Sequence, residues 1–176
     1  MSHIDENPDS VHLFVALDRK KDNPLNSGKM AIRQIIRNYD DDLSIIQAKC
    51  NLNQGMSFRL YRTVNSRSLS KAFKLFQHKL IDIPDPKGIE SLWKSCLLSS
   101  NASNERKLLV DIDSDCLDEP YNRLIDLGVR IHESVKTPRG YHIVTDPFDT
   151  RNFQYDNVEI KKDALIFVKM IPVNTI

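Results

Sequence analysis

The chain has 176 residues, 40% of them hydrophobic and 28% charged, with a formal net charge of +1. This length suits one compact domain, or two small halves that share a core. The balanced charge excludes a strongly basic protein, so any affinity for nucleic acid must come from local patches. No apolar run approaches the roughly 20 residues of a membrane helix, and residues 1–10 are polar, unlike a signal peptide. We therefore expect a cytoplasmic protein without membrane contact.

The first part of the chain alternates strand-like and helix-like patterns. "VHLFVAL" predicts a strand over 11–17, and a polar turn then leads to a helix predicted over 29–38. "LSIIQAK" and "SFRLYRTV" predict a hairpin of two strands around the turn-rich "CNLNQG", over 43–49 and 57–64. Apolar residues at three- and four-residue spacing then predict an amphipathic helix capped by Ser66 or Ser68.

The Pro/Gly-rich stretch "IDIPDPKG" marks a seam between two halves. The elements expected after it are a helix at 89–100, a strand at 107–113, a helix at 117–127 and a hairpin of strands at 129–135 and 141–145. The closing "NVEIKKDALIFVKMI" fits two short strands or one long strand broken near Lys162 and Asp163. We therefore predict a polar tail at 1–10 and one α/β (α+β) domain at 11–176. Its two small α/β halves would span about 11–83 and 88–176.

Charged residues are unevenly distributed along the chain. The window from Leu43 to Ile81 contains no Asp or Glu but has seven basic residues: Lys49, Arg59, Arg62, Arg67, Lys71, Lys74 and Lys79. Such a window is usually a solvated surface, and it is alternatively the electrostatic footprint of a nucleic-acid interface. Acidic residues gather instead at Asp40–Asp42 and between Asp111 and Glu119.

Two aspartates end the apolar strand of "KLLVDIDSD". Because side chains alternate along a strand, Asp111 and Asp113 point to one face while Val110 and Ile112 point to the other. A bridging cation would relieve their repulsion, and hard oxygen ligands suit Mg²⁺ or Mn²⁺, which take further ligands from water and substrate phosphates. The pair thus predicts a site for a metal and a nucleotide. For Asp115 we favour a role in a turn or a helix cap.

The segment "SVKTPRGYHIVT" places a basic turn directly before a strand. Lys136, Thr137 and Arg139 offer two cations and a hydroxyl, and Gly140 lets backbone N–H groups approach a ligand closely. His142 is the second residue of the strand predicted at 141–145. Together these groups predict a cradle for a triphosphate beside the two aspartates. The alternative for His142 is a structural histidine.

These motifs resemble the archaeo-eukaryotic primase and primase-polymerase superfamily, in particular its small phage- or plasmid-type members. "VDID" (110–113) matches the family's hydrophobic-Asp-hydrophobic-Asp strand end. "GYH" (140–142) is similar to its small-residue-x-His motif, with Gly140 where the family usually has Ser. "KKDALIFV" offers Asp163 as the third acidic residue, with Glu159 as the alternate. "FRLYRTVNSRSLSKA" looks like part of the N-terminal half of such members.

The resemblance implies a primase-polymerase-like catalytic domain with an RRM-like antiparallel sheet. It would be a nucleotidyltransferase of DNA replication, acting on nucleoside triphosphates and on single-stranded or primed nucleic acid. A replication or repair protein would be a further partner, and a phage in a bacterial host a source. The residues that would hold Mg²⁺ or Mn²⁺ are Asp111, Asp113 and Asp163. The residues implied at the nucleotide are Lys136, Thr137, Arg139, Gly140 and His142, and those near nucleic acid are Arg59, Arg62, Arg67 and Lys71.

Two other functions remain open on the sequence. The short chain and Gly140 favour a nucleotide- or nucleic-acid-binding protein that has the same fold but does not polymerise. A metal-dependent phosphohydrolase is the other, and it would release inorganic phosphate where a polymerase releases pyrophosphate. The paired aspartates and His142 favour the polymerase-type enzyme over both.

Overall fold

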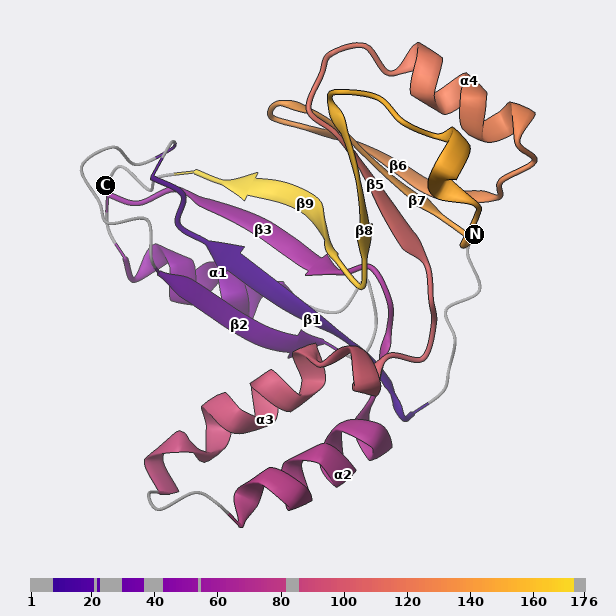
Figure 1. Cartoon of the computed structure of the whole chain (residues 1–176). Helices are drawn as coiled ribbons and strands as arrows, with labels where there is room; N and C mark the ends of the chain where they lie inside the picture. Colours follow the sequence, from indigo (N-terminus) through magenta and orange to yellow (C-terminus); the bar gives the residue numbers. More distant parts are fainter. Residues whose placement is uncertain are drawn as a thin grey trace.

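The computed structural model describes residues 8–20, 22, 30–36, 43–53, 55–81 and 86–172. Two antiparallel sheets lie side by side, and helices cover the outer side of each (Figure 1). Mixed helices and antiparallel strands confirm the predicted α+β class. Within the described ranges, none of the helices has the length and apolar character needed to cross a membrane.

The first sheet has the strand order β2-β1-β3-β9, and a short strand, β4, also pairs with β1. Its strands are β1 (Ser10–Leu17), β2 (Ala31–Ile36), β3 (Phe58–Thr63), β4 (Arg67–Ser68) and β9 (Leu165–Ile171). Helix α1 (Ser44–Asn51) packs Ile46 and Cys50 onto one face of this sheet, against Phe14 and Leu60. That face is closed, and the opposite face of the sheet is directed toward the second sheet.

Helices α2 (Leu69–Leu80) and α3 (Ile89–Leu98) pack against each other beside one end of the first sheet (Figure 1). The Ser68 hydroxyl caps α2 by accepting a hydrogen bond from the Lys71 N–H at 3.0 Å, as the sequence led us to expect. Short 3₁₀ turns flank this region and the second sheet: η1 (Pro86–Gly88), η2 (Ser100–Ala102) and η3 (Thr150–Asn152).

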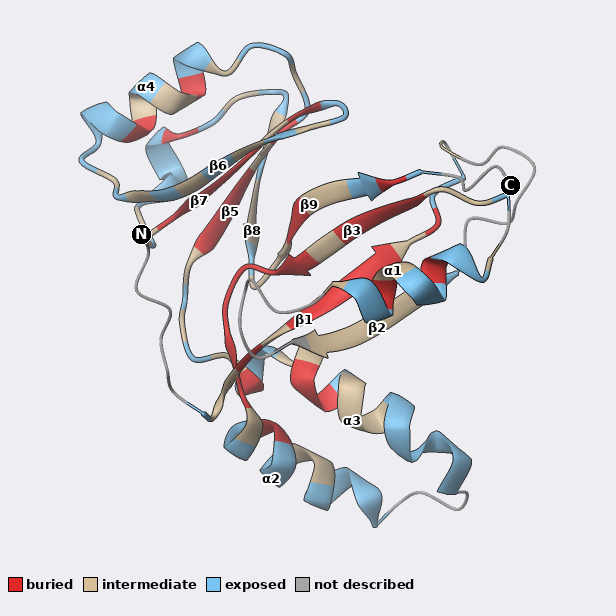
Figure 2. Ribbon diagram, turned by 180° about the vertical axis from the view of Figure 1, so that it is seen from behind, coloured by how far each residue is buried: buried red, intermediate tan, exposed pale blue. Residues whose placement is uncertain are grey.

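The second sheet has the strand order β6-β7-β5-β8 and is antiparallel throughout. Its elements are β5 (Leu108–Ile112), α4 (Asp118–Asp126), β6 (Ile131–Thr137), β7 (Gly140–Thr145) and β8 (Val158–Lys162). With β5 counted first, the strand order is 2-3-1-4 with a helix between the first two strands, as in an RRM-like sheet, but the short 3₁₀ turn η3 lies between the last two strands where that fold has its second helix. Figure 2 shows that buried residues follow the central strands of both sheets.

Two predicted elements are wrong, and tertiary pairing explains both. The segment predicted as a helix at 29–38 contains strand β2, because it pairs along β1 from Leu17↔Ala31 to His12↔Ile36. The segment predicted as a strand at 43–49 forms α1, whose Ile46 and Cys50 are one helical turn apart and both buried. There is accordingly no hairpin at this place, and β3 pairs with β1 and β9. The predicted turn at 23–28 lies outside the described residues.

The remaining predicted elements are confirmed, with boundaries shifted by a few residues. The closing segment forms two strands in different sheets, and the chain turns between them at Asp163, whose φ is +52°. The chain thus enters the second sheet at β5 and returns to the first at β9. We call the first sheet with α1, α2 and α3 the first unit, and the second sheet with α4 the second unit. Helix α3 and strand β9 both belong to the first unit, although both follow the seam inferred from the sequence.

Candidate functional site

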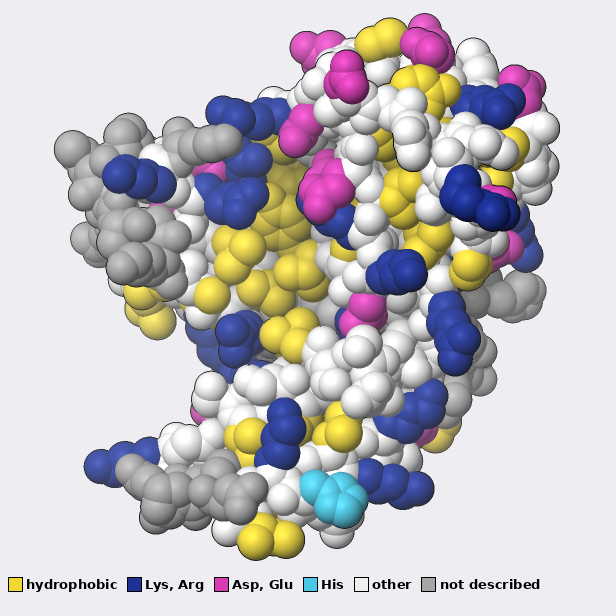
Figure 3. Space-filling model, viewed as in Figure 1, with side chains coloured by type: hydrophobic (Ala, Val, Ile, Leu, Met, Phe, Trp, Pro, Cys, Tyr) yellow, Lys and Arg dark blue, Asp and Glu magenta, His cyan; other side chains and the backbone are white. Residues whose placement is uncertain are grey.

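A pocket of about 460 Å³ opens between the two sheets. Its walls are formed by Arg19, Lys20, Arg59, Tyr61, Asp111, Asp113, Thr137, Arg139, His142, Lys161 and Phe167. Figure 3 shows the hollow between the two units, with hydrophobic side chains on its floor and Lys and Arg side chains beside it. Two predicted motifs contribute to this one pocket: the pair of Asp111 and Asp113, and the segment "SVKTPRGYHIVT" that contains His142.

A row of polar side chains crosses the second sheet at the pocket. His142, Asp111 and Glu159 stand directly opposite one another on β7, β5 and β8, so they share one face of the sheet. His142 Nε2 lies 3.3 Å from one oxygen of Asp111, and Lys161 Nζ lies 2.5 Å from the other. Asp113 follows at the exposed end of β5 and lines the same pocket. The strand pairing therefore brings together Asp111 and His142, as the sequence analysis predicted.

Asp111 is held in its ionised form. The hydrogen bond from His142 and, after it, the Lys161 ammonium lower the pKa of Asp111 to about 2, against the opposing effect of partial burial. A carboxylate with this pKa carries its full charge at neutral pH. Asp111 is therefore available as an anionic ligand, but two donors of the protein already contact it.

His142 has a defined tautomer. The backbone N–H of Phe167 donates to His142 Nδ1 at 3.0 Å, so Nδ1 is an acceptor and the proton of the neutral ring is on Nε2. Phe167 belongs to β9 of the first sheet, so this hydrogen bond also joins the two units. The Nε2–H group is directed toward Asp111 and the pocket.

The first sheet supplies a cationic and aromatic wall. Arg59 of β3 binds Asp22 through Nε at 2.6 Å and Nη2 at 2.7 Å. The rings of Tyr61 and Phe167 meet edge to face with centroids 5.9 Å apart. Arg19 and Lys20 are exposed and follow the end of β1. The pocket thus has five Lys or Arg residues against Asp111 and Asp113, and its net charge favours an anionic ligand.

The sequence analysis did not identify five of these residues: Arg19, Lys20, Tyr61, Lys161 and Phe167. A signal for the first two was present, because "DRKK" follows an apolar strand just as the two aspartates end one. For Tyr61 and Phe167 the signal is weaker, since an aromatic residue in a strand is ordinarily part of the core. Their exposure to the pocket depends on how the two sheets are set together.

The turn before β7 is built for close approach of two strands. A Cβ atom at Gly140 would lie only 1.8 Å from the carbonyl oxygen of Ile112, so glycine is required at this position. The serine that the family usually has there would not fit. Thr137 and Arg139 line the pocket, whereas the Lys136 ammonium lies 5.8 Å from the centroid of the Tyr141 ring. Strand alternation puts Lys136 on the face opposite to His142, away from the pocket.

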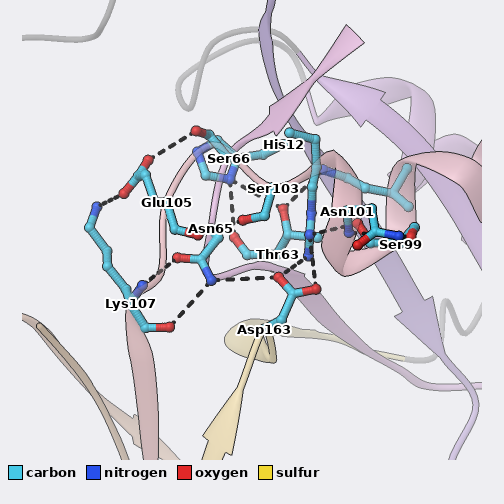
Figure 4. A network of polar contacts seen from close by, with 12 residues as sticks. His12, Thr63, Asn65, Ser66, Ser99, Asn101, Ser103, Glu105, Lys107 and Asp163 are labelled. Atoms are coloured by element: carbon cyan, nitrogen blue, oxygen red, sulfur yellow. Dashed lines mark hydrogen bonds and ion pairs between the residues drawn. The ribbon is translucent and has the colours of Figure 1, made fainter. Parts of the chain in front are cut away.

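The proposed third acid, Asp163, lies in a different cluster. Arg67 contacts both of its carboxylate oxygens at 2.7 and 3.0 Å, and the Asn65 amide lies 3.5 Å from it (Figure 4). The structure therefore does not bring Asp163 to the aspartate pair. Glu159, the alternate, shares the face of Asp111 and is mostly exposed.

The predicted nucleic-acid contacts are dispersed. Arg62 is buried and forms an ion pair with Glu133, and Arg67 is buried against Asp163. Neither side chain is accessible to a nucleic-acid strand. Lys71 is exposed on α2, where its ammonium donates to the Ser103 carbonyl at 2.8 Å. Of the four predicted contacts, Arg59 is the one that lines the pocket.

The pocket holds carboxylate oxygens, which are the kind of ligand that divalent metals such as Mg²⁺ bind. Among the described residues, no three His, Cys, Asp or Glu side chains form a group that could hold a metal ion. Yet oxygens of Asp111 and Glu159 converge on one cation of the protein, lying 2.5 and 2.9 Å from Lys161 Nζ. Hard oxygen donors around a positive charge fit Mg²⁺ or Mn²⁺, which complete their coordination with water and phosphate oxygens.

Comparison with protein-family models, with curated proteins and with solved structures finds no match for this chain. The resemblance to primase-polymerases therefore rests on the motifs themselves. What the geometry adds is that two of those motifs, "VDID" and "GYH", meet in one pocket, beside cationic and aromatic side chains.

Proposed function

We propose that this protein is a metal-dependent nucleotidyltransferase of the primase-polymerase type that binds a nucleoside triphosphate in the pocket between its sheets. The observation that carries the proposal is the composition of that pocket. Two aspartates on one strand end, Asp111 and Asp113, and five Lys or Arg side chains line a space of about 460 Å³. A triphosphate needs cations along its length, and acidic residues are useful beside it when they share a divalent ion with it.

The side chains have distinct roles in this proposal. Arg19, Lys20 and Arg139 are exposed and would neutralise the phosphates. His142 keeps its Nε2 proton because Nδ1 is engaged, so it can donate a hydrogen bond to a phosphate oxygen. Tyr61 offers an aromatic surface against which a base or sugar can pack. Mg²⁺ or Mn²⁺ held by Asp111 and Asp113 would supply activation of a 3′-hydroxyl and neutralisation of the departing pyrophosphate.

The second substrate would be a single-stranded or primed nucleic acid that provides the 3′-hydroxyl. Three lysines of the acid-free window are exposed on α2, namely Lys71, Lys74 and Lys79. They are better placed to contact a strand than the buried Arg62 and Arg67. Such an activity belongs to DNA replication or repair in the cytoplasm, with a protein of that machinery as a partner and a phage as a source.

The test is calorimetric titration of ATP and dATP into the protein with Mn²⁺ present and then chelated. We expect metal-dependent binding that Asp111→Asn reduces at least about tenfold, because one charged metal ligand is lost. Asp115→Asn is the matched control, since this exposed aspartate two residues past Asp113 is not among the pocket residues. Equal binding by the wild type and Asp111→Asn would show that the site is elsewhere.

Extension assays on primed and unprimed strands then address the chemistry. Nucleotide incorporation with release of pyrophosphate supports the transferase. Release of inorganic phosphate alone would instead identify a phosphohydrolase.

A second candidate is a nucleotide-binding protein that does not polymerise. It is favoured by the capture of Asp163 by Arg67, which leaves Asp111 and Asp113 without this third acid. Binding of ATP in the titration without any extension product would support this candidate. Its affinity would depend on the pocket cations, so Arg139→Gln would weaken binding in either case.

A further inference from the structure

Lys161 lies between two carboxylates at the pocket. Its ammonium nitrogen lies 2.5 Å from Oδ2 of Asp111 and 2.9 Å from Oε2 of Glu159. The two carboxylates face each other across the β5–β8 pairing, so without a cation they would repel. Lys161 follows Glu159 by two residues on β8 and therefore projects from the same face of the strand.

The Lys161 side chain is not enclosed by the protein. It is 36% exposed and lines the open pocket. The guanidinium of Arg67, by contrast, is 1% exposed and forms hydrogen bonds through several N–H groups. The Lys161 ammonium is a compact charge on a flexible side chain, so it can change partners more easily. Rotation of a few bonds carries that end from the carboxylates toward the centre of the pocket, where a polyanion would lie.

We propose that Lys161 is a resident counter-ion of Asp111, which it bridges to Glu159, and that it leaves Asp111 when a divalent ion held by Asp111 and Asp113 binds together with a triphosphate. The inference rests on the proposed function and assigns Lys161 a role in the order of binding. A divalent ion alone must displace the ammonium without compensation. With a triphosphate present, the displaced ammonium gains phosphate oxygens as new partners, so the two ligands should bind cooperatively.

The test measures Mn²⁺ binding directly, from the loss of the free-ion electron paramagnetic resonance signal during titration. Without nucleotide, Lys161→Gln should bind Mn²⁺ at least about tenfold more tightly than the wild type, because a competing unit charge beside the carboxylates is gone. Lys162→Gln removes the same charge from the next residue and should behave as the wild type. Lys161→Arg keeps a cation there and should also bind Mn²⁺ weakly.

Cooperativity provides the second readout. ATP should tighten Mn²⁺ binding by the wild type by a larger factor than Mn²⁺ binding by Lys161→Gln. Equal Mn²⁺ affinities of Lys161→Gln and Lys162→Gln would overturn the inference, whereas Mn²⁺-dependent ATP binding by the wild type would still support the proposed function. Absence of Mn²⁺ binding by every variant, with and without ATP, would reject both. Thermal unfolding followed by circular dichroism confirms that each variant is folded.

Discussion

Two of the ion pairs in this protein, Asp163–Arg67 and Asp111–Lys161, have different surroundings. The first pair lies where the chain passes between the two units, in a cluster of Asn65, Arg67, Lys107 and Asp163 that we call the joint. There Arg67 binds both carboxylate oxygens of Asp163. The Arg67 side chain is 1% exposed and also donates to the Ser99 carbonyl. At the pocket, the carboxylate of Asp111 meets Lys161, which is 36% exposed and can exchange its partners for water or a ligand. The ion pair at the joint is therefore shielded from water, whereas the ion pair at the pocket is open to water and ligands.

The difference gives the Asp163 cluster a structural role, and it agrees with the binding site that we propose at Asp111. The joint connects three segments. Asn65 binds both the N–H and the carbonyl of Lys107 and approaches Asp163 (Figure 4). Arg67 comes from the adjacent β4. Lys107 and Asp163 are where the chain passes between the sheets. The joint therefore fixes how the sheets are set, and through them the shape of the pocket.

The largest effect is expected from opening the joint. Arg67→Met leaves the partly buried Asp163 without its guanidinium, so the free energy of unfolding should fall by about 3 to 5 kcal/mol. Urea denaturation followed by circular dichroism measures this change. Lys71→Met removes an exposed cation nearby and should cost less than about 1 kcal/mol.

A double variant tests whether the loss comes from the uncompensated charge. Arg67→Met with Asp163→Asn removes both charges, and the asparagine tolerates the positive φ of this position. Part of the stability should return, because a neutral pair leaves no unpaired ion. If the two losses simply add, the ion pair does not account for the stability of the joint.

A smaller effect is expected from acid, through His12. Burial, followed by the nearby Arg62 charge, lowers the pKa of His12 to about 4, and its Nδ1 lies 3.0 Å from the Thr63 carbonyl. His12 of the unfolded chain therefore takes up a proton near pH 6.5, whereas His12 of the folded protein stays neutral until the pH is close to 4. His12 contributes its full stability above pH 6.5 and loses it as the pH falls toward 4, by about 2 kcal/mol between pH 7 and 4.5.

The measurement is the free energy of unfolding across that pH range for the wild type and His12→Asn. The asparagine amide can replace Nδ1–H as a donor to Thr63 but does not titrate, so its stability should depend less on pH. Parallel curves for the two proteins would contradict the assignment to His12.

The site was more predictable from the sequence than the joint, for a physical reason. Asp111 and His142 lie in adjacent strands of a small sheet, so their motifs alone imply that they meet. Asp163 was ambiguous because its partner Arg67 is 96 residues away, and no local pattern encodes such a contact. Lys136 was misplaced although strand alternation from His142 could have assigned its face.

The two wrong elements have a similar cause. Ile32, Ile35 and Ile36 have the spacing of a helix, but pairing with β1 decides that they form a strand. In 43–49 the adjacent Ile45 and Ile46 resemble a strand, yet both belong to α1, where Ile45 is exposed and Ile46 is buried against the sheet. Short apolar runs leave this choice open until the sheet that receives them is known.

The smallest effect on stability is expected at the pocket, from Asp111→Asn. Because its pKa of about 2 lies below that of an unfolded aspartate, ionised Asp111 stabilises the fold above about pH 4, and this contribution is lost as the pH falls through 2. Water in the open pocket screens the charges, so the change to Asn should lower the free energy of unfolding at pH 7 by only about 1 kcal/mol. Lys161 keeps Glu159 as its partner.

The comparison variant is Asp163→Asn, measured with Asp111→Asn by urea denaturation. It should lower the free energy of unfolding clearly more, because it breaks a buried ion pair. Equal losses would mean that Asp111 is as structural as Asp163, and the weak ligand binding expected of Asp111→Asn would then report on folding as well as on the site.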